Sequence, residues 1–225
     1  MFYAALHSTS AAPRGCIWVQ QIRIPITWIR AFLKATTGNL ERVFEVDAYL
    51  RRGLRIEVTT DASPYGLGAV LSVGNALVSQ LASPLTTTDR EVLGLPSVPS
   101  SSDQQAAEAL AILVSLREWA PRWQNRRVNL CLRTDNIAAL TTLVKLQPHS
   151  SALGIIAREL ALDIAASSFT PDEAVHIPGI ANVAADYLSR LCDPHACGTP
   201  PPYLDPHSRH TCGVRDIGWW RSLPR

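Results

Sequence analysis

The chain has 225 residues, of which 47% are hydrophobic and 18% charged, and its formal net charge is +2. This apolar, weakly charged composition excludes a disordered chain, and five cysteines over this length are too few for a disulfide scaffold. No run of about 18 apolar residues is free of polar breaks, which excludes an integral membrane protein. The odd cysteine count and the absence of a signal-peptide pattern predict an intracellular protein, without distinguishing cytoplasm from nucleus.

Composition divides the chain into three zones. Residues 1–53 contain an apolar stretch at near-helical spacing, interrupted by Pro25, which predicts two short helices or one kinked helix. Residues 54–191 alternate strand and helix patterns. Residues 192–225 are rich in Pro, Gly and His without periodicity, which predicts an irregular tail.

The middle zone predicts five strands and four helices. Alternating apolar residues place the strands at 54–61, 66–73, 76–81, 128–134 and 174–177. Because Gly74-Asn75 suits a tight turn, the first three strands form an antiparallel meander.

Helical spacing places the helices at 103–119, 136–145, 151–166 and 182–191. Asp103 is expected to cap the first helix and Pro121 to end it, after a Ser/Thr/Pro-rich loop over 82–102. The pattern is that of an α/β protein, with a mixed sheet of three antiparallel and two further strands flanked by helices.

Four carboxylates stand where these elements can bring them together. Asp61 and Asp135 end the first and fourth strands, Glu108 interrupts an apolar helix, and Asp186 opens the last helix. Such a cluster is self-repelling unless hard divalent cations bind among its oxygens, and paired Mg²⁺ ions suit phosphodiester cleavage. Asp61 is equally compatible with a turn, and Asp135 and Asp186 with helix caps. Glu108 is harder to explain structurally, because a carboxylate on an apolar helix face usually needs a partner.

Four short motifs in this order resemble those of ribonuclease H domains. Thr60-Asp61-Ala62-Ser63 followed by Gly66-x-Gly68-Ala69 is similar to the first-strand signature of the family. Gln105-x-x-Glu108-x-x-Ala111 and Thr134-Asp135-Asn136-x-Ala138 resemble its helical Glu and its fourth-strand Asp. The segment from His176-Ile177-Pro178-Gly179 to Ala185-Asp186-x-Leu188-Ser189-Arg190 closely resembles the closing motif in reverse transcriptases of LTR-type retroelements. The resemblance covers residues 54–191, and residues 1–53 resemble the connection segment of such polyproteins.

The resemblance implies a ribonuclease H-like fold and a metal-dependent endonuclease that cleaves the RNA strand of RNA–DNA hybrids, leaving 5′-phosphate and 3′-OH ends. Two Mg²⁺ ions, or Mn²⁺, would be held by Asp61, Glu108, Asp135 and Asp186. Asp61 would bridge both ions. Asp186 would serve the ion that activates water, and Glu108 and Asp135 the ion beside the leaving 3′ oxygen.

The resemblance also implies substrate contacts and partners. The substrate-binding residues would be Ser63, Gly66, Gly68, Asn136, Asn182 and Arg190. The partners would be an RNA–DNA hybrid and a reverse transcriptase polymerase domain, in cis or in trans, with no membrane. Two departures stand out: the short loop 178–181 lacks the His of many cellular ribonucleases H, and no basic substrate-gripping helix follows residue 145. Hybrid affinity would then depend on a neighbouring domain.

Other functions compete with this interpretation. A catalytically inactive, retroelement-derived domain could bind hybrid or support an assembly, and in a purely structural domain the acids would be caps. Proofreading exonucleases are disfavoured because Asp61-Ala62-Ser63 lacks their second acid, and integrases because the last acid is Asp186 rather than Glu.

Two further groups of residues are candidate ligand sites. Arg117, Arg122, Arg126 and Arg127, interleaved with Trp119 and Trp123, could contact phosphate, although a solvated helix end is favoured. The tail contains a set of potential zinc ligands: Cys192, His195, Cys197, His207, His210 and Cys212. Their irregular spacing disfavours a structural zinc site.

Overall fold

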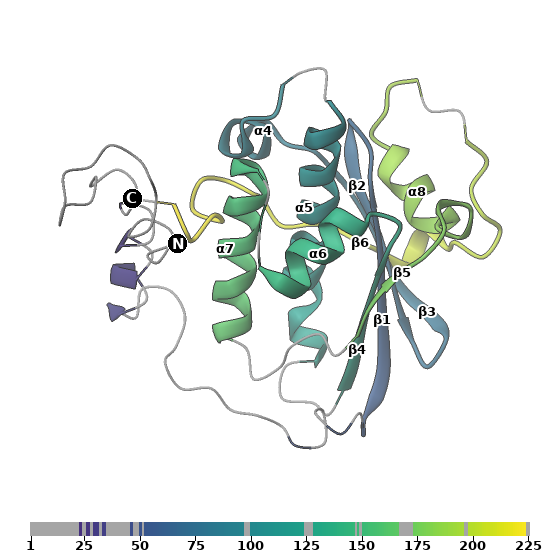
Figure 1. Ribbon diagram of the computed structural model, residues 1–225. Helices are drawn as coiled ribbons and strands as arrows, with labels where there is room; N and C mark the ends of the chain where they lie inside the picture. The colour runs from purple at the N-terminus through teal and green to yellow at the C-terminus, as the bar shows by residue number, and fades with distance from the viewer. Residues whose placement is uncertain are drawn as a thin grey trace, which may run out of the picture.

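A six-stranded mixed sheet forms the centre of the computed structural model (Figure 1). The structure describes residues 52–96, 100–123, 128–146, 148, 150–166, 173–195 and 198–223, together with isolated residues between 23 and 50. The strand order is β5-β4-β1-β2-β3-β6. The strands are β1 (Leu54–Ala62), β2 (Gly66–Val73), β3 (Ala76–Pro84), β4 (Val128–Thr134), β5 (Glu173–His176) and β6 (Arg209–His210).

The first three strands form the predicted antiparallel meander. β2 pairs antiparallel with both β1 and β3, and the turn between β2 and β3 has positive φ at Gly74 (55°) and Asn75 (71°). This turn geometry matches the twist of a two-residue hairpin and favours Gly and Asn. β4 pairs parallel with β1, and β5 parallel with β4, so the expected mixed sheet is confirmed.

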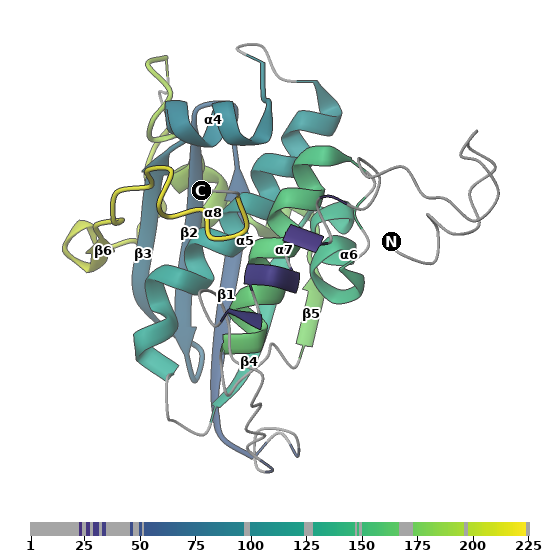
Figure 2. The same ribbon diagram turned by 90° about the vertical axis from the view of Figure 1, so that its left-hand side faces the viewer.

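Helices cover both faces of the sheet. They are α4 (Thr87–Leu93), α5 (Ser101–Trp123), α6 (Ile137–Lys145), α7 (Ser151–Ala166) and α8 (Val183–Arg190). α4 to α7 lie on one side of the sheet and α8 lies on the other, against β1 and β2 (Figures 1 and 2). The expected α/β class is therefore confirmed, with one short strand, β6, added at the edge.

The prediction of a loop over residues 82–102 is wrong in part. β3 extends to Pro84, and α4 follows directly. Thr86 caps α4 through a capping box with Asp89, and Gly94 ends it in the left-handed conformation with φ 65°. Thr86-x-x-Asp89 is a helix-start signal within the Ser/Thr-rich composition.

The predicted ends of α5 also need correction. The helix begins at Ser101, and Asp103 accepts the backbone N–H of Ser100 over 2.7 Å, so Asp103 lies inside the first turn. At the other end α5 continues through Pro121 to Trp123. A proline in the last turn removes only the hydrogen bond to the carbonyl of Arg117, which a helix end tolerates better than its interior does.

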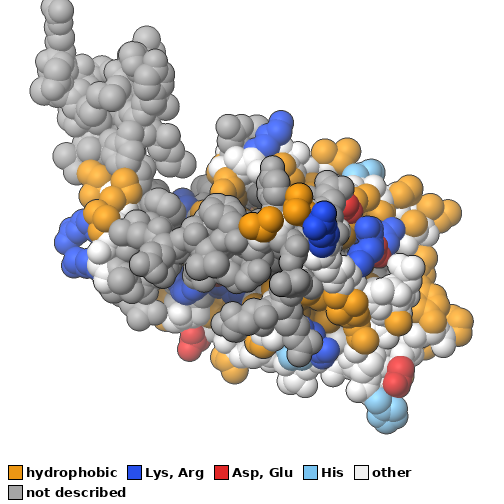
Figure 3. Space-filling model, turned by 90° about the horizontal axis from the view of Figure 1, so that it is seen from below, with side chains coloured by type: hydrophobic (Ala, Val, Ile, Leu, Met, Phe, Trp, Pro, Cys, Tyr) orange, Lys and Arg blue, Asp and Glu red, His pale blue; other side chains and the backbone are white. Residues whose placement is uncertain are grey.

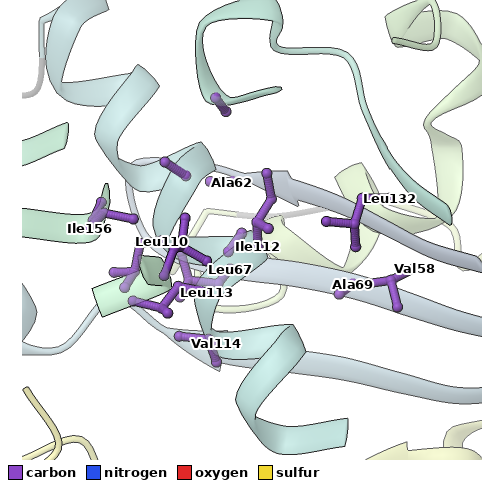
Figure 4. Close-up of a cluster of buried hydrophobic side chains, with 14 of the residues drawn as sticks. Val58, Ala62, Leu67, Ala69, Leu110, Ile112, Leu113, Val114, Leu132 and Ile156 are labelled. Carbon is purple, nitrogen blue, oxygen red and sulfur yellow. The ribbon is translucent and has the colours of Figure 1, made fainter. Parts of the chain in front are cut away.

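The hydrophobic core lies between the sheet and α5. Ile56 and Val58 alternate along β1 with 2% and 0% exposure, as the strand pattern predicts. Leu110 and Leu113 of α5 pack in the same buried cluster as Leu67 of β2 (Figure 4). This packing fixes α5 against the sheet and so determines where Glu108 lies.

Residues 198–223, the C-terminal strap, pack onto the domain instead of forming a free tail. Their backbone is mostly irregular, but Arg215 reaches Asp89 of α4 over 2.9 Å with both side chains at most 1% exposed. Trp220 is buried in the core with 1% exposure. The backbone N–H groups of Arg221 and Ser222 donate to the buried Glu159 carboxylate of α7.

Two sequence-based expectations concern the chain's organisation. The helical segment predicted over residues 1–53 lies outside the described residues, apart from isolated positions. Among the helices that the structure describes, none combines the length and apolarity needed to cross a membrane.

Candidate active site

Two of the predicted carboxylates come from the ends of neighbouring parallel strands. Thr59 of β1 pairs with Arg133 of β4, so Asp61 and Asp135 follow at equivalent positions two residues later. Asn136, not Asp135, caps α6, because its side chain accepts the N–H of Ala139 over 3.0 Å. The carboxylate of Asp135 is therefore not committed to a helix cap.

Glu108 of α5 lies close to Asp61 and Asp135 at the ends of β1 and β4. Its side chain is 4% exposed, and Gln104, one helical turn earlier, donates to its Oε1 over 3.2 Å. The same Gln104 amide also donates to the carbonyl of Ala62, at the end of β1. The other oxygen, Oε2, is buried and has no hydrogen-bond partner among the described residues.

Asp61, Glu108 and Asp135 form a compact group, here called the carboxylate cluster. One carboxylate oxygen from each lies within 4.8 Å of the others. Burial, together with repulsion from Asp61 and Asp135, raises the pKa of Glu108 to about 9. Burial, together with repulsion from Asp135 and Asp186, raises the pKa of Asp61 to about 7, against the hydrogen bond from Ser189.

The carboxylate cluster fits a divalent cation. Mg²⁺ and Mn²⁺ prefer oxygen ligands. The buried Oε2 of Glu108 is such a ligand atom, and it has no hydrogen-bond partner among the described residues. A bound cation would offset the mutual repulsion of the three carboxylates, which contributes to the raised pKa values of Asp61 and Glu108.

Asp186, the fourth predicted ligand, lies at the edge of the carboxylate cluster and outside that close group. Its Oδ1 is 2.7 Å from the guanidinium of Arg190, one turn later on α8. The two side chains are 42% and 63% exposed. Asp186 is the fourth residue of α8, after Asn182 at the N-cap position, so it is not a cap.

Asp61 is held by side chains of the closing motif. Ser189 Oγ lies 2.7 Å from its Oδ2, and Asn182 Nδ2 lies 3.4 Å from its Oδ1. Asn182 also donates to the carbonyl of Thr60 over 3.0 Å and is itself 1% exposed. Since α8 provides these contacts, it positions the central carboxylate as well as carrying Asp186.

Three residues predicted as substrate contacts lie beneath α8. Ser63 is buried in the turn between β1 and β2, and its hydroxyl donates to the carbonyl of Ser189 over 2.7 Å. A Cβ on Gly68 would stand 2.1 Å from the carbonyl oxygen of Ala185, and one on Gly66 would stand 2.9 Å from that of Ser189. These short distances give both glycines a packing role, because they let the backbones of β2 and α8 approach each other.

Most described members of the Arg and Trp cluster are occupied by contacts within the fold. Arg117 binds Glu159 and Asp163 of α7, and Trp119 and Trp123 are buried, while Arg126 and Arg127 lie outside the described residues. On the face seen in Figure 3, Lys and Arg side chains stand in several small groups among the coloured residues. In the described part of the tail, no three His, Cys, Asp or Glu side chains come close enough to bind a metal ion.

Sequence reasoning missed two residues that position the acids. Gln104 lies four residues before Glu108, so both occupy one face of α5, and this spacing could have identified it. Ser189 belongs to the closing motif, but its contact with Asp61 joins residues 128 positions apart. No local pattern reveals such a contact.

Comparison with known proteins gives similarity to solved structures only. No family model matches the chain, and no curated protein matches it. An RNase H1 from the halophilic archaeon Halobacterium salinarum is 17% identical, with a TM-score of 0.43 over 60% of this chain and 93% of that chain. An RNase H1 isolated from compost is 15% identical, with a TM-score of 0.44 over 60% of this chain and 91% of that one. The N-terminal RNase H domain of a Mycobacterium tuberculosis protein is 13% identical, with a TM-score of 0.42 over 60% and 94%.

Proposed function

We propose that residues 54–191 are a ribonuclease H domain that cleaves the RNA strand of RNA–DNA hybrids, as part of a retroelement reverse transcriptase. One observation carries the proposal: Asp61, Glu108 and Asp135 converge from two strand ends and a helix, with oxygens within 4.8 Å of one another. Buried carboxylates gathered in this way favour divalent cations, and such cations serve phosphodiester hydrolysis. The closing motif from His176 to Arg190 supports the retroelement context.

The residues of the chain would divide the work. Glu108 and Asp135 would hold one Mg²⁺ or Mn²⁺, Asp186 would hold a second, and Asp61 would contribute to both. Bound there, the cations supply the charge that activates a water molecule and stabilises the leaving 3′ oxygen. Ser189 and Asn182 keep Asp61 oriented, and Gln104 keeps Glu108 oriented.

The hybrid would reach the carboxylate cluster across the edge where β1 and β4 end. Asn136, which follows β4, and Arg190, which pairs with Asp186, would contact sugar or phosphate groups. Ser63, Gly66, Gly68 and Asn182 are buried against α8, so they would instead support the site by holding β2, α8 and Asp61 in place. Guanidinium and amide groups are suited to phosphate and ribose oxygens, and the 2′-OH distinguishes RNA from DNA. A polymerase domain, in cis or in trans, would supply further affinity for the hybrid.

An end-labelled RNA–DNA hybrid tests the proposal directly. The full chain is incubated with Mg²⁺ or Mn²⁺, with single-stranded RNA and duplex DNA as substrate controls. Hybrid-only cleavage that is lost in Asp135→Asn and retained in Glu91→Gln, an exposed acid of α4, is the expected result. Cleavage by Asp135→Asn at the parental rate contradicts the site. Metal-dependent hybrid binding without any cleavage favours the inactive, hybrid-binding alternative.

A further inference from the structure

The ion pair between Asp186 and Arg190 stands at the outer edge of the carboxylate cluster. Both Nε and Nη2 of Arg190 lie 2.7 Å from the same oxygen, Asp186 Oδ1. The pair spans one turn of α8, and both side chains are substantially exposed. The carboxylate expected to bind a second cation is therefore already neutralised by a side chain of the same helix.

Arg190 also lies close enough to act on Asp61. Ser189 lies between Asp186 and Arg190 on α8, and its hydroxyl lies 2.7 Å from Asp61 Oδ2, so this turn of α8 packs against Asp61. The Asp186 carboxylate and the Arg190 guanidinium both interact electrostatically with Asp61. Arg190 therefore acts on both acids that would hold the outer cation.

A cation that binds between Asp61 and Asp186 meets this charge. It must either displace the guanidinium from Oδ1 or share the Asp186 carboxylate with it, and in both cases Arg190 opposes its binding. The inner position, formed by Glu108, Asp135 and Asp61, has no such competitor: Glu108 Oε2 has no hydrogen-bond partner in the described part of the chain.

We propose that Arg190 competes with a divalent cation for Asp186, so that the carboxylate cluster has a stronger inner position and a weaker outer position whose affinity Arg190 sets. The inference deepens the proposed function and rests on it, because it concerns the second cation of that reaction. Arg190 is in this sense a positioning residue: its guanidinium holds the Asp186 carboxylate until a cation replaces the guanidinium.

The size of the effect follows from the exposure of the pair. Exposed ion pairs contribute up to about 1 kcal/mol, which corresponds to a factor of about five in an equilibrium constant. Removing the guanidinium is therefore expected to tighten the outer position about two- to five-fold and to leave the inner position unchanged.

Binding of Mn²⁺ alone to the full chain tests this inference. Free Mn²⁺ is measured by electron paramagnetic resonance at pH 7.5 in the absence of nucleic acid. The parent protein is expected to show two classes of sites, and Arg190→Gln is expected to tighten only the weaker class. Arg122→Gln is the matched control: it makes the same charge change at an exposed position of α5, fourteen residues or about 21 Å along the helix from Glu108.

A second pair of variants isolates the role of Asp186. Asp186→Asn should abolish the weaker class, and adding Arg190→Gln to it should then change nothing. A conservative variant, Arg190→Lys, should give an intermediate affinity, because it keeps the charge and loses the two-point contact. Thermal unfolding followed by circular dichroism verifies that each variant is folded.

Each other outcome has a definite meaning. If the affinity of the weaker class of Mn²⁺ sites is unchanged in Arg190→Gln, the inference is overturned. If the variant loses affinity for the hybrid while both classes of Mn²⁺ sites are unchanged, the inference is also overturned, and Arg190 is a phosphate contact only. Because Mn²⁺ binding needs no substrate, failure of the proposed function is seen separately, as absence of hybrid cleavage by a protein that binds Mn²⁺ as described.

Discussion

Glu108 is a carboxylate placed where it costs folding free energy. It is 4% exposed, its Oε2 has no partner among the described residues, and its pKa is raised to about 9, first by burial and then by Asp61. We predict that Glu108→Gln stabilises the metal-free protein at pH 8 by about 1–3 kcal/mol, because a neutral amide removes the cost of burying a carboxyl group whose pKa rises on folding. Thermal unfolding in EDTA measures this change. The same variant should lose most of the stabilisation that Mn²⁺ gives the parent protein. A variant less stable than the parent in EDTA would contradict this prediction.

The pH dependence of stability follows from the same two acids. The pKa values of Asp61 and Glu108 rise on folding to about 7 and about 9, so the folded chain binds protons that the unfolded chain releases. The contribution of these two acids to stability is therefore greatest below their unfolded pKa values and falls as pH rises. It falls between about pH 4 and 7 for Asp61, and between about pH 4 and 9 for Glu108. We predict a slope of up to about 1.4 kcal/mol per pH unit for each group.

Urea unfolding of the metal-free protein across this range measures the slope. Subtracting the curve of Asp61→Asn/Glu108→Gln removes the contribution of all other groups. A difference that is flat or rises with pH contradicts the prediction.

At the scale of elements, the seating of α8 on β2 depends on Gly68. A Cβ there would stand 2.1 Å from the carbonyl oxygen of Ala185 and 2.3 Å from the amide nitrogen of Ser189, both backbone atoms. We predict that Gly68→Ala displaces α8, destabilises the fold by about 1–3 kcal/mol or more, and abolishes metal stabilisation, because Ser189 then loses Asp61.

Gly154→Ala is the matched control for this prediction. Gly154 lies in α7, and an added Cβ meets its nearest atoms at 3.7 Å, which is ordinary contact. The substitution should stabilise the helix by about 0.5–1 kcal/mol. If both variants have the same unfolding midpoint in urea, the close packing of β2 and α8 is not a constraint.

The sequence predicts the elements that carry the acids better than it predicts their contacts. Asp61 and Asp135 fall at equivalent positions because β1 and β4 are parallel, and strand alternation is enough to locate both strand ends. Ser, Thr and Pro dominate residues 82–102 and predict a loop where α4 lies, because the Thr86–Asp89 capping box is too brief to outweigh this composition. The pairing of Asp186 with Arg190 depends on side-chain conformation, which the order of residues does not specify.

At the scale of the whole molecule, the C-terminal strap joins α4, α5 and α7. The Arg215 and Asp89 side chains are 1% and 0% exposed, and Arg215 also donates to Ser83 over 2.7 Å. We predict that Arg215→Met destabilises the protein by about 3–5 kcal/mol, because it leaves Asp89 as a buried, unpaired charge. Urea unfolding measures the loss, and Arg209→Met, at an exposed position of the strap, should change stability by less than about 0.5 kcal/mol.

A double variant distinguishes the ion pair from simple packing. Arg215→Met combined with Asp89→Asn should cost less than the sum of the two single changes, because the buried charge is removed together with its partner. Strict additivity would show that the two residues act independently.

The strap was not predictable as part of the fold for a physical reason. It has no periodicity, and its anchors are single side chains: Arg215, Trp220 and the backbone at Ser222. Their partners are distant in sequence, as with Asp89, which is 126 residues before Arg215. Composition does not reveal the partners of these anchors. A Pro- and His-rich segment with two tryptophans therefore resembles a tail until its contacts are known.

The strap has a consequence for how the protein is made. At about 5–20 residues per second, a ribosome needs about 6 to 25 s to add the 126 residues that separate Asp89 from Arg215. Until the strap has been made, the nascent chain lacks Trp220, so the part of the core that Trp220 covers stays open to solvent. Completion of the domain therefore waits for the strap, and a nascent chain stalled before residue 215 should be a client for chaperones.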